Sequence, residues 1–267
     1  MPIRRAALAA CVIVSATVLS GISSTAATGV APRQPETGAA AAARGAEARL
    51  TSAAAVSAVR RCPAASYGAH FFAPGKGKTV ALTFDDGPGR TTAAVLRILA
   101  HYRVPATFFN LGVNVAARPG LARKEVKAGY AMGNHTWNHP NLVLLSASQQ
   151  AAEMDRMSAE LRAAAHVRPC VFRPPYGDYD SVTLRLAHQR RMGVWLWSVD
   201  TQDWMADGSG SAYWVNRIIR LAEREGGALR HPVVLMHNQP IGNPATVAAL
   251  PVIIRFFRAH GYRFVKL

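Results

Sequence analysis

The chain has 267 residues, half of them apolar, which is enough for one large folded domain with a substantial core. Its formal net charge is +16 at pH 7, and residues 61–267 alone hold 25 basic and 13 acidic side chains, a net charge near +12. This excess favours attraction to anionic polymers such as those of a cell wall. The sequence has no basic helix and no basic patch interleaved with aromatic residues, so we expect no nucleic-acid partner.

Residues 1–27 are expected to be a signal peptide. A short basic start, residues 1–5, is followed by an apolar stretch, residues 6–19, and then by small residues around Ala26 and Ala27. This order predicts export and cleavage near residues 26–31, so we expect a secreted or cell-wall-associated protein. An uncleaved membrane anchor is the alternative, but the apolar stretch is short for a helix that spans a bilayer.

Residues 28–65 are expected to form a flexible linker, and residues 66–267 the folded domain. The linker is rich in Ala with scattered Thr, Ser, Pro and Gly, and it offers too little apolar surface to offset the entropy of ordering. A marginal Ala-rich helix is the alternative. Two cysteines remain outside the leader, Cys62 and Cys170. An exported protein can pair them, but the sequence leaves open whether a disulfide forms.

From residue 79 onward, predicted strands alternate with predicted helices. Apolar runs rich in β-branched and aromatic residues predict strands at 79–84, 106–111, 130–132, 171–173, 194–199, 233–236 and 262–266. Helical spacing of apolar residues predicts helices at 91–102, 121–128, 148–165, 181–191, 212–225 and 246–259. The alternation indicates parallel βα units in one α/β domain, either an open doubly wound sheet or a closed barrel.

Ionisable side chains recur where the predicted strands end. They are Asp85 and Asp86 after the first strand, His135 and His139 after the third, Arg173 at the end of the fourth, Asp200 and Asp203 after the fifth, and His237 after the sixth. In both candidate architectures the strand ends meet on one face. Each residue alone is as readily explained as a surface or core residue, but together they predict one functional site.

The segment HTWNH, residues 135–139, places two histidines four residues apart. On a helical turn this spacing puts both imidazoles on one face, as metal binding requires. Thr136 follows the first histidine, where a zinc protease of the HExxH type has Glu, so a third ligand must come from elsewhere, and a carboxylate is the natural candidate. Two histidines and one carboxylate leave positions for water and substrate, which is typical of a catalytic site.

Five ordered segments resemble the polysaccharide deacetylase family, the NodB-homology carbohydrate esterases of family 4. They are TFDDGP (83–88), HTWNH (135–139), RPPYG (173–177), DTQDW (200–204) and LMH (235–237). The resemblance runs from about residue 78 to residue 267. It implies a distorted (β/α) barrel with about seven parallel strands, and a divalent metal, Zn²⁺ before Co²⁺ or Ni²⁺.

The resemblance implies that Asp86, His135 and His139 bind this metal. Asp85 would be the general base that activates the metal-bound water, and Arg173 would hold Asp85 and keep it ionised. The division suits amide hydrolysis, because a metal polarises the carbonyl and acidifies water while a separate carboxylate takes the proton.

The same resemblance assigns the remaining matched residues. His237 would be the general acid that protonates the departing amine, oriented by Asp203. The backbone N–H of Tyr176 would help to stabilise the oxyanion, and Trp204 and Leu235 would form the wall of the pocket for the acetyl methyl group. Asp200 belongs to a matched motif without a clear role. Asn238 departs from the family, which often has Asp after the histidine of the last motif, and we expect this difference to shift the pKa of the histidine or the pH optimum.

The resemblance thus implies a secreted, metal-dependent hydrolase that removes N-acetyl groups from peptidoglycan N-acetylglucosamine, with chitooligosaccharide as the next candidate. An acetylxylan O-esterase and a non-catalytic carbohydrate-binding protein are the alternatives. The complete base, acid and metal set argues against the last, because a binding protein needs no base–acid pair. The expected partner is a polysaccharide, with transient attachment to the cell wall through the basic surface, and we expect a monomer.

Overall fold

The computed structural model describes Cys62, residues 64–206 and residues 208–267. The predicted signal peptide and most of the predicted linker lie outside these residues. The strands are β1 (Ala69–His70), β2 (Thr79–Asp85), β3 (Thr107–Asn110), β4 (Ala131–Asn134), β5 (Val171–Phe172), β6 (Gly193–Trp195), β7 (Val199–Asp200), β8 (Val233–His237) and β9 (Arg263–Phe264). The helices are α2 (Thr92–Tyr102), α3 (Gly112–Ala117), α4 (Pro119–Lys127), α5 (Ala147–Ala165), α6 (Ser181–Gln189), α7 (Ala212–Gly227) and α8 (Pro244–Ala259), with 3-10 turns η1 (Leu142–Leu144), η2 (Pro175–Gly177) and η3 (Asp203–Met205). None of the described helices is both long and apolar enough to span a bilayer.

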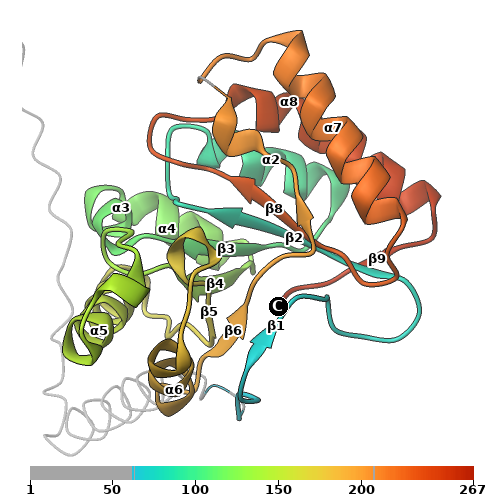
Figure 1. The fold of residues 1–267 in the computed structure, drawn as a ribbon. Coiled ribbons are helices and arrows are strands. Elements are labelled where there is room, and N and C mark those ends of the chain that lie inside the picture. The colour runs from blue at the N-terminus through green and yellow to red at the C-terminus, as the bar shows by residue number, and fades with distance from the viewer. Residues whose placement is uncertain (1–61, 63, 207) are drawn as a thin grey trace, which may run out of the picture. The chain divides into compact units, whose positions relative to one another are not determined.

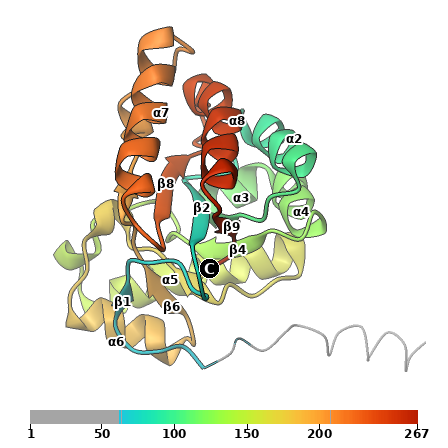
Figure 2. The same cartoon turned by 90° about the vertical axis from the view of Figure 1, so that its right-hand side faces the viewer.

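The strands form one parallel sheet that curls into a distorted barrel. Their order is β1-β6-β5-β4-β3-β2-β8-β7, with β9 added alongside the start of β2. β6 and β7 lie near opposite ends of this order, yet only residues 196–198 join them, so the two ends of the sheet must come close together. Figures 1 and 2 show the helices arranged around the outside of the sheet. The predicted fold class is therefore confirmed.

One predicted strand is wrong. Residues 194–199 form two short strands, β6 and β7, that belong to different parts of the sheet. The N–H of Leu196 donates to His70 O at 2.8 Å, whereas the N–H of Ser198 donates to Val233 O at 3.1 Å, so the chain changes partner within the run. An apolar run is buried whether or not the strand is interrupted, so the periodicity of apolar residues does not reveal the interruption. The short elements β1 and α3 were also absent from the prediction.

The core lies between the sheet and its helices. Every residue of β2 is buried, as expected for a parallel strand covered on both faces. Phe84 of β2 stacks on Phe108 of β3, with ring centroids 5.2 Å apart. On the outer side, Leu99 of α2 and Phe257 of α8 are fully buried in the same cluster. Each such side chain contributes about 1.5–3 kcal/mol through burial, and the cluster holds the strand ends in place for the site described below.

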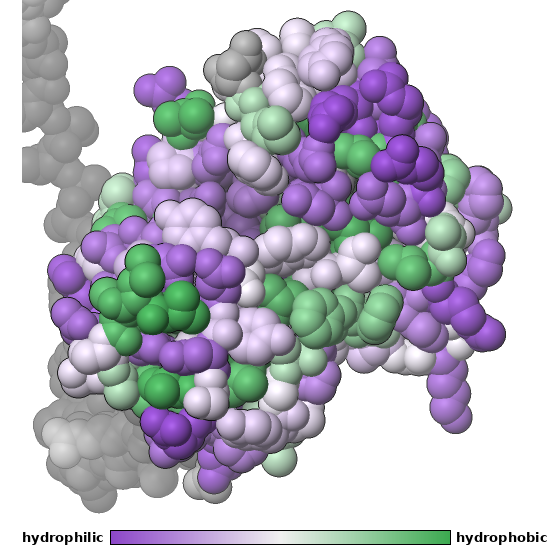
Figure 3. Space-filling model, in the orientation of Figure 1, coloured by the Kyte–Doolittle hydropathy of each residue, from purple (hydrophilic) through white to green (hydrophobic). Residues whose placement is uncertain are grey.

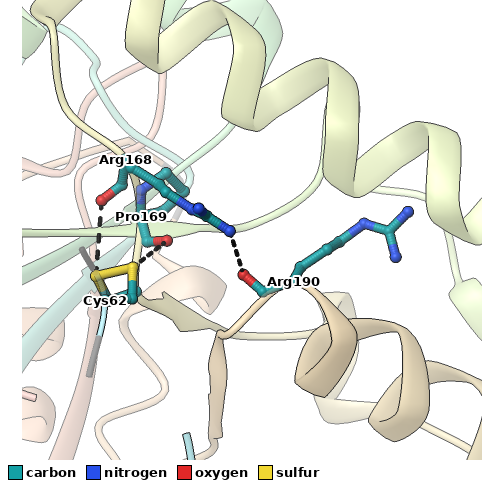
Figure 4. The surroundings of a disulfide bond; sticks show 5 residues. Cys62, Arg168, Pro169 and Arg190 are labelled. Atoms are coloured by element: carbon teal, nitrogen blue, oxygen red, sulfur yellow. Dashed lines mark hydrogen bonds between the residues drawn. A yellow bond between two sulfur atoms is a disulfide. The ribbon is translucent and has the colours of Figure 1, made fainter. Parts of the chain in front are cut away.

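Cys62 and Cys170 form a disulfide, which answers the question that the sequence left open (Figure 4). Cys170 directly precedes β5, and the bond joins residues 108 positions apart. Beside it, Arg168 donates to Arg190 O at 2.9 Å, which ties the same turn to the end of α6 (Figure 4). The covalent bond therefore fixes the start of the described chain to the sheet.

Candidate functional site

A cavity of about 400 Å³ opens at the carboxyl ends of the strands. It is lined by Asp85, Asp86, His135, His139, Pro174, Tyr176, Trp197, Asp200, Trp204, Leu235 and His237. The structure therefore brings together, in one place, residues from all five matched segments. Of the residues assigned from the sequence, only Arg173 and Asp203 do not line the cavity. Both are fully buried behind it, where they contact the residues that they were expected to orient.

Asp86, His135 and His139 form a compact donor set. Asp86 Oδ1 lies 3.5 Å from Nε2 of each histidine, and the three potential ligand atoms lie within 4.8 Å of one another. Asp86 Oδ1 is buried, and it has no hydrogen-bond partner in the described part of the chain. An orphaned carboxylate oxygen that faces two imidazole nitrogens suits a divalent cation, so these residues fit the implied metal.

The state of His135 agrees with a ligand role. Its Nδ1 donates to Arg173 O at 2.7 Å, which leaves the lone pair of Nε2 directed at Asp86. Burial lowers the pKa of His135 to about 3, although the charge of Asp86 opposes this effect, so the ring is neutral at pH 7. A backbone carbonyl that fixes the tautomer of a ligand histidine is a common support of metal sites.

The two histidines lie in a loop and not on a helical turn, contrary to the sequence interpretation. β4 ends at Asn134, and Thr136 and His139 have φ angles of 73° and 66°. Glu153 of α5 accepts a hydrogen bond from the N–H of Trp137 at 2.9 Å, and the Thr136 hydroxyl accepts one from the N–H of His139 at 3.1 Å. These bonds shape the loop, and nothing in the sequence motif pointed to Glu153.

Arg173 is fully buried and connects Asp85 to the end of β6. Its Nη1 donates to Asp85 Oδ1 and to Thr83 Oγ1, both at 2.8 Å. Its Nε donates to Trp195 O at 3.0 Å, and its Nη2 to Leu196 O at 2.9 Å. The break after β6 thus supplies the carbonyl oxygens that satisfy a buried guanidinium, which is otherwise costly to remove from water.

Burial raises the pKa of the Asp85 carboxyl, while Arg173 and then His237 lower it. Burial is the larger effect, so the pKa of Asp85 is raised on balance, and Arg173 limits the rise. Oδ2 of Asp85 points toward the donor set, 3.8 Å from His135 Nε2. A carboxylate with a raised pKa takes up a proton more readily than an exposed one, which suits a general base.

His237 and Asp203 form a buried pair on the other side of the cavity. His237 Nδ1 donates to Asp203 Oδ1 at 2.6 Å, and its backbone N–H donates to Oδ2 at 2.8 Å. Burial lowers the pKa of His237, but the charge and hydrogen bond of Asp203, together with the charges of Asp85 and Asp86, outweigh it and raise the pKa to about 9. The ring is therefore an imidazolium at neutral pH, able to donate a proton into the cavity that it lines.

The start of α8 holds Asp203 in place. Thr246 Oγ1 donates to Asp203 Oδ2 at 2.5 Å, and Asn243 Nδ2 donates to the same oxygen at 3.2 Å. The side chain of Asn243 also accepts from the N–H of Thr246 as the cap of α8. Neither residue was identified from the sequence. The spacing Asn243-Pro244-Ala245-Thr246 does mark a helix start, but it does not show what the helix start faces.

Aromatic and apolar residues form the walls. Tyr176 lies in η2 with a φ of 61°, and its ring packs against that of His139 at 4.6 Å between centroids. Trp204 is 53% exposed, whereas Leu235 is buried. Asp200, which had no clear role, lines the cavity and accepts from the N–H of Gln202 at 2.8 Å. It therefore shapes the loop that carries Asp203.

Comparisons with known proteins point in one direction. The profile of the family described as "Polysaccharide deacetylase" matches residues 73–195. A peptidoglycan-N-acetylglucosamine deacetylase of Bacillus cereus is 34% identical over 73% of this chain and 88% of its own length. The peptidoglycan-N-acetylglucosamine deacetylase PgdA of Listeria monocytogenes is 32% identical over 71% of this chain, and the chain spans only 38% of that relative's length. A bifunctional xylanase/xylan deacetylase of Cellvibrio japonicus is 32% identical over 68% of this chain and 26% of its own length.

Solved structures give the same result. The Bc1960 peptidoglycan N-acetylglucosamine deacetylase superposes with a TM-score of 0.69 at 32% identity, over 75% of this chain and 91% of the other. BA3943, described as a pseudoenzyme of carbohydrate esterase family 4 from Bacillus anthracis, superposes with a TM-score of 0.67 at 26% identity, over 76% of this chain and 68% of the other. The shared fold therefore includes an inactive protein, and activity must be argued from the residues of the site.

Proposed function

The chain belongs to the polysaccharide deacetylase family, and from this premise we propose that it is an exported, metal-dependent enzyme that removes N-acetyl groups from a glycan, with peptidoglycan N-acetylglucosamine as the favoured substrate. One observation carries the proposal. A two-histidine, one-carboxylate donor set lies beside a carboxylate with a raised pKa, and a protonated histidine faces the same cavity. A site that only bound sugar would need neither the base nor the acid.

Each residue of the site has a chemical task in amide hydrolysis. Asp86, His135 and His139 would hold the metal, with Zn²⁺ favoured over Co²⁺ or Ni²⁺, and the bound ion would polarise the acetamide carbonyl and acidify water. Asp85 accepts the proton of the attacking water on Oδ2. His237 donates the proton on Nε2 to the departing amine nitrogen, since an amine leaves poorly without one.

The remaining residues position the acetyl group. The N–H of Tyr176 donates to the carbonyl oxygen as negative charge develops there. Trp204 and Leu235 surround the methyl group and exclude water from it. The base and the acid lie on adjacent strands, where Asp85 of β2 and His237 of β8 are register partners. Each is held by its own buried partner, Asp85 by Arg173 and His237 by Asp203.

Acetate release tests the proposal and its alternatives together. The full-length protein loaded with Zn²⁺ is incubated with peptidoglycan fragments, chitooligosaccharides and acetylxylan, and each reaction is repeated with a chelator. We expect release from peptidoglycan fragments that stops with the chelator and returns with added metal. Release from acetylxylan alone would favour the O-esterase, for which the Cellvibrio relative is a precedent by name. No release from any substrate would favour the non-catalytic binding protein.

Export is proposed from the order of basic, apolar and small residues at the N-terminus. The test is to sequence the N-terminus of the protein recovered from the medium or the wall of its native host. Cleavage between residues 26 and 31 supports export of a soluble enzyme, whereas an intact Met1 on membrane-bound protein supports the anchor.

We further propose that the enzyme associates with the wall through the outer surface of α2 and α8. Residues 87–124 and 226–267 contain no Asp or Glu, and exposed Arg97 and His101 of α2 lie beside Arg255 and Arg258 of α8. We call these four residues the α2–α8 cationic face. Tyr102 holds two of the guanidinium groups, accepting from Arg255 on its hydroxyl at 3.0 Å and from Arg258 on its carbonyl at 2.6 Å.

The chemistry of the α2–α8 cationic face favours a phosphate-rich polymer over a lipid surface. Among the described residues, no large apolar side chain that is exposed belongs to α2 or α8, so the face offers charge without groups that insert into a bilayer. Hydrophilic side chains also cover the surface over the neighbouring α7, whereas apolar side chains gather near α3 and α5 (Figure 3).

A matched pair of variants tests this binding on a phosphocellulose column. The triple variant Arg97→Gln/Arg255→Gln/Arg258→Gln removes three charges from the face, and Arg162→Gln/Arg185→Gln/Arg191→Gln removes three exposed charges from α5, α6 and the turn after α6. We expect the first to elute at clearly lower salt than the second, with acetate release from soluble substrate unchanged in both. Equal elution of the two variants would show that only net charge matters.

A further inference from the structure

Glu125 is a buried carboxyl that the proposed chemistry does not use. It lies on α4, and its side chain is fully buried. Asn110 Nδ2, at the end of β3, donates to Glu125 Oε2 at 2.6 Å, and the side chain of Asn238, directly after β8, interacts with the same carboxyl. Glu125 Oε1, Asn110 Oδ1 and Asn238 Oδ1 are all buried and lack a donor within the described residues.

A proton on Glu125 Oε1 resolves this excess of acceptors. The carboxyl then donates from Oε1 to an amide oxygen and still accepts from Asn110 on Oε2, so two unsatisfied atoms gain a partner. Burial raises the pKa of Glu125 to about 8, although the amides of Asn110 and Asn238 oppose this rise. Among the described residues, burial and these amides are the causes of the shift, and no ionised side chain from the packed elements α2, α3, α5 or β4 contributes to it. Glu125 is therefore neutral at pH 7.

The two asparagines connect Glu125 to both halves of the site. The carbonyl of Asn110 accepts from the N–H of His135 at 3.1 Å, so the end of β3 locates a metal ligand. The N–H of Asn238 donates to Asp85 O at 3.0 Å, and Asn238 directly follows His237. The side chain of Asn238 donates to Thr92 at 2.9 Å. The side chain of Asn238 therefore contacts Thr92 and Glu125. Asn238 was expected to shift the pKa of His237, but it is not among the causes of that shift.

We propose that Glu125 is a positioning residue: its neutral carboxyl joins Asn110 to Asn238 and so sets the spacing between the His135 side and the Asp85–His237 side of the cavity. The proposal rests on the deacetylase function for its kinetic readout, but its structural readouts do not. We call the connection Asn110–Glu125–Asn238 the tie. It acts on the site through backbone groups, because Asn110 and Asn238 contact His135 and Asp85 by main-chain hydrogen bonds. A displacement of the order of 1 Å at such a site costs about 100-fold in rate.

Three variants of the full chain test the tie. Glu125→Gln keeps a neutral planar group with one donor and one acceptor face, whereas Glu125→Leu removes both. Gln150→Leu is the control, because Gln150 is also buried and hydrogen-bonded, to Leu145 and Thr183, but lies away from the cavity. For Glu125→Gln we expect kcat within about threefold of wild type. For Glu125→Leu we expect a fall in kcat of about tenfold or more, weaker Zn²⁺ binding and a smaller change in KM.

The dependence of stability on pH tests whether the folded protein holds Glu125 neutral, whereas the Zn²⁺ affinity and kcat of Glu125→Leu, compared with those of Gln150→Leu, test the positioning role. Glu125 holds its proton more tightly in the folded state, so its contribution is complete below about pH 4.5 and is lost as the pH rises to about 8. Glu125→Gln lacks this loss. The difference in urea midpoint between Glu125→Gln and wild type should therefore grow between pH 5 and pH 8 and then stay constant.

Two results would overturn the tie. One is a Glu125→Leu protein that is folded and keeps the kcat and Zn²⁺ affinity of Gln150→Leu. The other is a midpoint difference between Glu125→Gln and wild type that is flat from pH 5 to pH 9, which would show an ionised Glu125. If wild type releases no acetate from any substrate, the deacetylase function fails, yet Zn²⁺ affinity and the pH dependence of stability still decide the role of Glu125.

Discussion

The neighbouring carboxylates Asp85 and Asp86 avoid mutual repulsion because the backbone turns between them. Asp85 ends β2 and directs Oδ1 to Arg173 at 2.8 Å. Asp86 has a left-handed φ of 66°, which points its side chain at the two histidines of the donor set. Oδ1 of Asp85 therefore faces Arg173, whereas Oδ1 of Asp86 faces the two histidines. The residue types were readable from the sequence, whereas the left-handed turn that separates them was not.

Asp203→Asn should move the alkaline limit of activity to lower pH. Asp203 is the main cause of the raised His237 pKa of about 9, and a general acid works only below its pKa, so removing this charge shifts the loss of activity downward by about 1–2 pH units. The measurement is kcat/KM between pH 6 and pH 10. Asp180→Asn, which changes the capping carboxylate of α6 outside the cavity, is the control and should keep the limit of wild type. An unchanged limit in Asp203→Asn would contradict the role of the pair.

At the scale of elements, the break between β6 and β7 shows what apolar periodicity conceals. The run from residue 194 to 199 was predicted as one strand because all of its residues except Ser198 are apolar. In the structure the chain leaves the sheet between Trp195 and Val199, and two freed carbonyls accept from Arg173. The need for this break is set by a residue some twenty positions earlier in the chain, which a local pattern cannot show.

Arg173→Lys should destabilise the fold although it keeps the charge. Lys has no planar fork, so it cannot reach Asp85, Thr83 and both carbonyls together. With about 1–3 kcal/mol lost for each buried group left unpaired, we expect the free energy of unfolding in urea to fall by about 3 kcal/mol. Arg190→Lys, at a paired arginine whose partner Asp155 is 60% exposed, should cost about 1 kcal/mol or less. Equal losses in the two variants would contradict this account.

At the scale of the whole molecule, the sequence predicted the fold class. It also predicted that the strand-end residues share one site, because ordered motifs and alternating elements are local signals. It missed Glu153, Thr246 and Glu125, which lie outside the matched segments and whose hydrogen bonds join one element to another. It also missed that HTWNH forms a loop, because a spacing of four fits a turn as well as a helix. The residues of the matched segments, including the buried Arg173 and Asp203, were thus easier to predict than the supporting residues outside those segments.

The disulfide is expected to stabilise the whole domain. It closes a segment with a sequence separation of 108, and removing a bond of this kind costs about 2–5 kcal/mol, mostly through the entropy of the unfolded chain. The double variant Cys62→Ser/Cys170→Ser should lose this amount in urea unfolding, and wild type treated with a reductant should match it. Unchanged stability in both would show that the bond does not restrain the unfolded chain.

The central claim is that one aspartate holds the metal while its neighbour takes the proton. The most direct measurement determines Zn²⁺ content and acetate release from peptidoglycan fragments in wild type, Asp85→Asn and His135→Ala. We predict that Asp85→Asn binds Zn²⁺ as wild type does and loses about 10²–10⁴-fold in kcat, whereas His135→Ala loses the metal and the activity together. Normal acetate release from Asp85→Asn, or loss of its Zn²⁺, would contradict the division of roles between Asp85 and Asp86.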